Sequence, residues 1–84
     1  MKLPKAKIYG IPKGKKKFVE LDVLGLLGKE KDIRAIAEFL THVADAMKTY
    51  RTKFGHIHLR DEVHRWPKGA SDIIVTRMTK KNGA

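Results

Sequence analysis

The stretch KEKDIRAIAEFLTHVADAMKTYRTKFG, residues 29–55, decides the fold, because it carries the long helical pattern of the chain. Apolar side chains recur at steps of three or four residues, which is the spacing of one face of an amphipathic helix. Glu30 and Asp32 stand where the helix dipole favours acids, and Gly55 is placed to end the helix in the left-handed conformation. The pattern predicts a helix over residues 29–53. Its apolar stripe comprises Ile33, Ile36, Ala37, Leu40, Val43, Ala44, Met47 and Tyr50.

Two strand patterns follow this helix. Residues 56–60 alternate between an apolar and a polar face, with His56, His58 and Arg60 on the polar one. Residues 61–70 form a predicted loop that contains Trp66, and Pro67 and Gly69 act as its breakers. Residues 71–76 are rich in β-branched side chains and predict a last strand.

Two further strand patterns precede the helix. Residues 5–9 alternate weakly, residues 10–14 have the composition of a turn, and residues 17–24 alternate clearly. These patterns predict a hairpin with a basic turn. One of its faces would display Tyr9 and Phe18.

The order strand, strand, helix, strand, strand predicts an α+β fold in a single domain, residues 1–84, with a core over about residues 5–77. We expect a four-stranded sheet with the long amphipathic helix packed on one face. The side chains expected under the helix are Ile8, Val19, Leu21, Val23, Ile57 and Leu59. The other sheet face stays open, and such faces are where small proteins form a homodimer or receive a partner.

The net charge of +10 is concentrated at the two ends of the chain. Residues 1–17 contain seven Lys and no acid, whereas residues 18–76 contain nine basic and nine acidic side chains. Basic ends can bind nucleic acid, or they can be solvated segments that keep a small domain soluble. The first alternative would use Lys13, Lys15, Lys16 and Lys17; the second includes a flexible C-terminal tail from Lys80.

Candidate chemistry centres on the histidines, because the chain has no cysteine. His56 and His58 share a strand face and could bind one metal ion, with His64, Asp61, Glu62 or Asp22 as further ligands. A general base formed by His58 with Asp61 or Glu62 is a second alternative. There is no His-Glu-x-x-His helix and no recognisable nucleophile. We therefore expect no metal site, no cofactor and no enzymatic activity.

Trp66 fits either a lid over the core edge or an anchor for a partner. The N-terminal residues lack the apolar run of a signal peptide, and no window is long and apolar enough for a membrane span. We therefore expect a cytoplasmic protein that does not enter a membrane.

Three segments carry a resemblance to a known family: residues 32–40 in the helix, the sequence HIHL at residues 56–59, and the sequence GASDIIV at residues 69–75. Over residues 19–77 the chain resembles immunity protein family 32 of bacterial polymorphic toxin systems. The resemblance implies an α+β protein that binds and blocks a cognate toxin without catalysis. The basic ends depart from the acidic character of many immunity proteins against nucleases, which puts a nuclease target in doubt.

Together these observations favour a small binding protein with a protein partner. The residues expected at its interface are Tyr9, Phe18, His56, His58, Arg60 and Trp66. Nucleic-acid binding through the lysine-rich N-terminal segment is the alternative.

Overall fold

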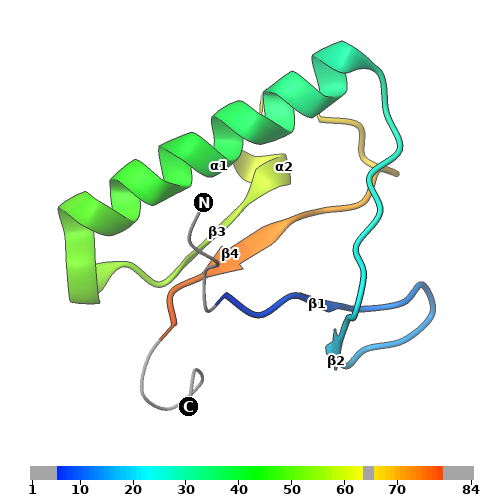
Figure 1. Ribbon diagram of the computed structural model, residues 1–84, viewed down its shortest axis with the longest axis horizontal. Coiled ribbons are helices and arrows are strands. Elements are labelled where there is room, and N and C mark those ends of the chain that lie inside the picture. The colour runs from blue at the N-terminus through cyan, green and yellow to red at the C-terminus, as the bar shows by residue number, and fades with distance from the viewer. Residues whose placement is uncertain (1–5, 64–65, 79–84) are drawn as a thin grey trace. The chain divides into compact units, whose positions relative to one another are not determined.

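The computed structural model describes residues 6–63 and 66–78, and these residues confirm the α+β class (Figure 1). The elements, in chain order, are β1 (Tyr9–Gly10), β2 (Val19–Glu20), α1 (Glu30–Tyr50), the 3₁₀ turn η1 (Arg51–Lys53), β3 (His56–His58), α2 (Leu59–Glu62) and β4 (Ile74–Thr76). His64 and the predicted flexible tail from Lys80 lie outside the described residues.

The chain divides into two compact units. The first comprises Met1–Leu27 with Met78–Ala84, and the second comprises Gly28–Arg77. The single domain expected from the sequence stays a prediction.

The strands form two separate two-stranded antiparallel sheets, so the predicted four-stranded sheet is wrong. β1 pairs with β2, and β3 pairs with β4. Alternation alone does not identify a strand's partner. In residues 17–24, only Val19 and Glu20 join a ladder. Ile8, Val19 and Val23, which were expected under the helix, are 48%, 46% and 78% exposed.

The helix α1 begins where the sequence predicts. The Asp32 carboxylate accepts a hydrogen bond from the Lys29 backbone N–H at 3.1 Å, which satisfies a donor that the first helical turn leaves unpaired. The buried face, however, is rotated from the predicted stripe. Phe39 and Val43 are buried, whereas Ile33 and Leu40 are 39% and 45% exposed.

The helix ends at a different residue from the one predicted. Arg51 takes φ +48°, and its N–H donates to the Met47 carbonyl. A turn follows in which the Phe54 N–H donates to the Arg51 carbonyl at 3.1 Å. Phe54, which follows this turn, is buried. Gly55 does not take a positive φ, so its predicted role as the helix terminator is wrong.

The core of the second unit lies between α1 and the segment that follows it. The buried side chains of the described residues are Phe39, Val43, Phe54 and Leu59, and Ile36, Met47, Ile57, Ile73 and Val75 pack against them. Figure 1 shows α1 running beside β3 and α2 in this unit. Leu59 was predicted in a strand that reaches Arg60, but the strand ends at His58 and Leu59 begins α2.

Candidate functional site

A polar cluster joins β3 and α2 to the residues that directly precede β4, and Asp72 is its centre. Asp72 Oδ2 lies 2.6 Å from His58 Nδ1 and 3.4 Å from Arg60 Nε. Asp72 Oδ1 accepts hydrogen bonds from the Arg60 backbone N–H at 3.1 Å and from the Ile73 N–H at 2.9 Å. Since Arg60 lies in the first turn of α2, the carboxylate also satisfies a helical donor from a distant part of the chain.

Asp72 is ionised in this arrangement. Partial burial by itself raises the pKa of the carboxyl group, but hydrogen bonds from His58, Arg60 and Ile73 and the charge interaction with His58 outweigh burial and lower the pKa. A carboxylate can only accept hydrogen bonds, so the proton in the His58–Asp72 bond belongs to His58 Nδ1. This fixes the imidazole orientation and leaves Nε2 as the second ring nitrogen available for an interaction.

The two histidines of β3 lie on the same strand face, as predicted. The ring centroids of His56 and His58 are 5.2 Å apart in an edge-to-face arrangement. Opposite them on β4 lie Thr76 and Ile74, while Ile57 and Val75 pair on the core side. We call the surface formed by His56, His58, Ile74 and Thr76 the ribbon face. The His58 side chain is 25% exposed, and Ile74 is 38% exposed.

The structure does not support the alternative in which His58 pairs with Asp61 or Glu62. Asp61 and Glu62 are close in sequence, but Asp72 is the acid that contacts the imidazole. Glu62 lies instead 3.8 Å from His42 of α1. One sequence signal could have identified Asp72: an acid placed directly before a β-branched strand that can pair with the histidine strand.

Trp66 is engaged within its own unit. Its indole Nε1–H donates to the Ser71 carbonyl at 3.0 Å, and its ring packs against the hydrophobic core. The side chain is half-buried. This arrangement favours the lid over the core edge among the two alternatives for Trp66.

The remaining predicted residues belong to the first unit. Tyr9 and Phe18 lie in and beside the β1–β2 hairpin. The exposed side chains of Lys13, Lys15, Lys16 and Lys17 surround its turn. The hairpin sheet is separate from the sheet that contains His56 and His58, and Arg60 lies in α2, so the predicted single open sheet face is wrong.

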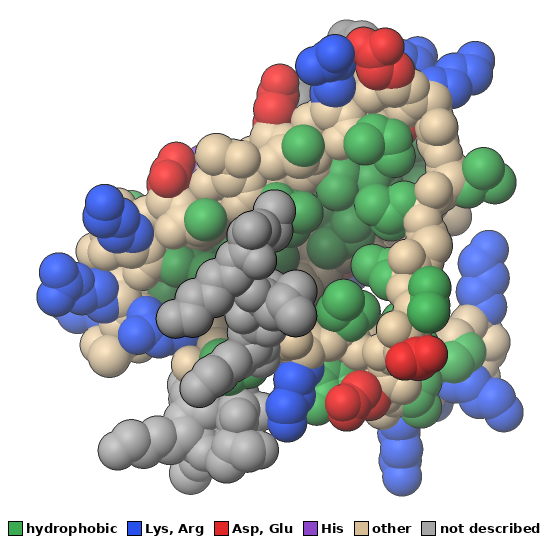
Figure 2. Space-filling model, viewed as in Figure 1, with side chains coloured by type: hydrophobic (Ala, Val, Ile, Leu, Met, Phe, Trp, Pro, Cys, Tyr) green, Lys and Arg blue, Asp and Glu red, His purple; other side chains and the backbone are tan. Residues whose placement is uncertain are grey.

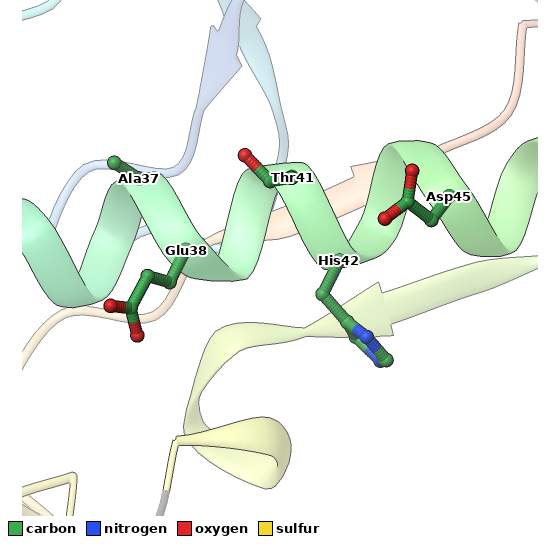
Figure 3. Close-up of a pocket in the computed structure, with 5 residues that line it drawn as sticks. All are labelled: Ala37, Glu38, Thr41, His42 and Asp45. Atoms are coloured by element: carbon green, nitrogen blue, oxygen red, sulfur yellow. The ribbon is translucent and has the colours of Figure 1, made fainter.

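Two shallow hollows among the described residues lie along α1. One, of about 380 Å³, is lined by Ala37, Glu38, Thr41, His42 and Asp45 (Figure 3). A second, of about 390 Å³, is lined by residues of α1 and by Glu62 and Val63. Such open depressions do not enclose a substrate as an active-site cleft does.

Neither a metal-binding cluster nor a membrane-spanning helix is found within residues 6–63 and 66–78. No group of three or more histidine, cysteine, aspartate or glutamate side chains there could hold a metal ion. None of the helices in these ranges combines the length and apolar character needed to cross a bilayer.

Comparisons with known proteins give no further assignment. No family model, no curated protein and no solved structure matches the chain.

Proposed function

We propose that this protein is a small, non-enzymatic binding protein that engages a protein partner through the ribbon face and the adjacent Arg60. The observation that carries the proposal is that one carboxylate, Asp72, hydrogen-bonds the His58 imidazole and forms an ion pair with the Arg60 guanidinium beside the exposed Ile74. Side chains that are held in place before binding lose less conformational entropy on association.

The polar cluster favours binding over catalysis. Both oxygens of Asp72 already accept hydrogen bonds from its own chain, so its carboxylate is committed to holding β3, α2 and β4 together. The two hollows described above are shallow and lie over α1. A catalytic site would need a substrate-enclosing pocket at the His58 imidazole.

The chemistry of the face indicates what the partner presents. His56, His58 and Arg60 supply N–H groups, and Ile74 supplies apolar contact area in the same region. A complementary protein surface would place carboxylate or carbonyl oxygens around a small apolar side chain. Arginine is a frequent centre of binding energy at such interfaces.

The resemblance to immunity protein family 32 supports this location and suggests the kind of partner. Two of the segments that carry the resemblance are neighbours in space, because β3 pairs with β4 and the Leu59 N–H donates to the Ile73 carbonyl at 2.8 Å. The proposed partner is accordingly a protein toxin that is blocked when this chain binds it.

The test compares affinity capture from the native host by the wild type, by a His56→Glu/Arg60→Gln variant and by a Lys31→Gln control on α1. We expect one protein in near-equal molar amount with the wild type and the control, and its loss with the double variant. The captured protein should be toxic when expressed alone and harmless with the wild type. Retention by the double variant, or recovery of no specific protein, contradicts the proposal.

Self-association is tested separately by sedimentation velocity. A dimer that the His56→Glu/Arg60→Gln variant converts to a monomer would assign the ribbon face to a second copy of the chain and not to a toxin.

A further inference from the structure

The β1–β2 hairpin carries a second surface, independent of the ribbon face. Tyr9 pairs with Glu20 and Gly10 pairs with Val19, and the Leu21 N–H donates to the Ile8 carbonyl in the same register. Phe18 directly precedes β2, so we infer from the alternation of side chains along the strand that Phe18 lies on the same side as Tyr9 and Glu20. Eight residues separate Tyr9 from Phe18 in the sequence, so the inferred common side depends on the hairpin register.

This aromatic face is exposed, and so in part is the opposite face, where Ile8 and Val19 are 48% and 46% exposed. Tyr9 is 45% exposed, Ile11 is 44% exposed and Phe18 is 57% exposed. Leu21 lies against Gly10 so closely that an added Cβ would come within 3.0 Å of its Cδ1 atom. Figure 2 shows that hydrophobic (green) and Lys or Arg (blue) side chains are both exposed over the β1–β2 hairpin.

The turn of the hairpin presents a dense positive charge. The Lys15 N–H donates to the Pro12 carbonyl at 2.9 Å, and Gly14 takes φ +82°, the left-handed conformation that the third residue of a type II turn requires. This tight turn places Lys13, Lys15, Lys16 and Lys17 within five residues of chain, all exposed. The nearest acid along the chain is Glu20, which lies beside Tyr9 and away from the turn.

We propose that the hairpin binds single-stranded nucleic acid, with bases stacked on Tyr9 and Phe18 and phosphates contacted by the lysines of the turn. Exposed aromatic rings beside clustered lysines are the combination that non-sequence-specific single-strand binders use. The lysines select a polyanion, and the rings select a polyanion with unpaired aromatic bases. A duplex offers only the first, because its bases are stacked within the helix.

The primary experiment measures fluorescence anisotropy of a labelled oligothymidylate of about 12 nucleotides with the full-length protein, as a function of salt. We expect a slope of log affinity against log salt of about −3, from about −0.7 for each phosphate that the four lysines neutralise. Lys15→Gln/Lys16→Gln should make this slope shallower by about 1.4. Tyr9→Ala and Phe18→Ala should each weaken binding at least about fivefold.

Matched controls separate stacking and local charge from general effects. Lys31→Gln/Lys48→Gln removes two exposed lysines of α1 and should leave the affinity and the slope unchanged. Tyr9→Phe and Phe18→Tyr keep an aromatic ring and should retain binding, which shows that loss in the alanine variants comes from loss of stacking. Ultraviolet crosslinking should place the oligonucleotide on Tyr9 or Phe18.

Any of four results overturns the proposal. These are no binding at about 50 mM salt, where phosphate contacts are strong; equal loss of affinity in the α1 lysine variant; equal affinity for a duplex of the same length; and equally effective competition by polyglutamate. The last result would assign the hairpin to acidic proteins instead.

Discussion

At the scale of single residues, Asp72 has the clearest energetic role. It accepts hydrogen bonds from two backbone N–H groups and from His58, with its side chain only 17% exposed. We expect Asp72→Asn to lower the free energy of unfolding by about 1–3 kcal/mol, since hydrogen bonds to a charged group are lost or weakened. Urea unfolding followed by Trp66 fluorescence measures this. The control Asp61→Asn, an exposed acid on α2, should change it little.

The same residue predicts a pH dependence of stability. The pKa of Asp72 is lower in the folded protein than its ordinary value, so ionisation favours the folded state. This contribution is complete above the pKa of the unfolded chain, about 3.9, and is lost as pH falls through the lower folded pKa. The difference in unfolding free energy between wild type and Asp72→Asn should therefore shrink below about pH 4. A constant difference down to pH 2 would contradict the assigned hydrogen bonds.

For Arg51 we predict the opposite effect, a rise in the free energy of unfolding on substitution, because its backbone conformation is unfavourable. A positive φ of 48° costs a non-glycine residue of this kind about 1–3 kcal/mol. Arg51→Gly should relieve more strain than it adds in unfolded-state entropy, and should raise the free energy of unfolding by about 0.5–1 kcal/mol. Lys48→Gly, inside α1, should instead lower it by about 1 kcal/mol. Thermal unfolding of the two variants in parallel shows whether each substitution raises or lowers the free energy of unfolding.

At the scale of the elements, the existence of α1 could be predicted from the sequence, but its inward face could not. The predicted stripe contained Ile33 and Leu40, which are exposed, and omitted Phe39, which is buried. Apolar residues occupy more than half the circumference around residues 33–47, so several helical faces fit the spacing. The choice among them depends on Phe54, Ile57 and Leu59, whose positions follow from the turn at Arg51.

Two adjacent residues of α1 test this rotated face. Phe39→Ala should lower the free energy of unfolding by about 3–5 kcal/mol, because it leaves a cavity in the core. Leu40→Ala should cost about 1 kcal/mol, because 45% of Leu40 is exposed. Urea unfolding of both variants is the measurement. Equal losses, or a greater loss for Leu40→Ala, would mean that the stripe predicted from the sequence is the side of α1 that packs against the core.

Part of the candidate site could be predicted from the sequence, and part of it could not. Alternation places His56 and His58 on one strand face, and the ring contact confirms it. The partner of His58 could not be found by proximity in sequence, because Asp72 is fourteen positions away and approaches only through the β3–β4 pairing. The shared face of Tyr9 and Phe18 depends in the same way on the register of a hairpin.

At the scale of the whole molecule, the burial of side chains is concentrated in one of the two units. Phe39, Val43, Phe54 and Leu59 all belong to Gly28–Arg77, and no side chain of residues 6–27 is buried. The sequence predicted one sheet because the two strand patterns before the helix and the two after it each offer an apolar face that one helix could cover. That inference assumed a shared core, whereas each sheet pairs only within its own unit among the described residues.

This distribution predicts that a chain of residues 28–84 folds without the hairpin. Every buried side chain of the described residues remains in it, and so does the Asp72 cluster. We expect a cooperative unfolding transition in which Trp66 fluorescence and helical circular dichroism change together, with modest stability because so short a chain buries little surface. Phe39→Ala in the shortened chain should abolish that transition. A gradual, non-cooperative change in the shortened wild-type chain would mean that residues 1–27 supply part of the core, and the hairpin would then have a structural role that its exposed aromatic face does not suggest.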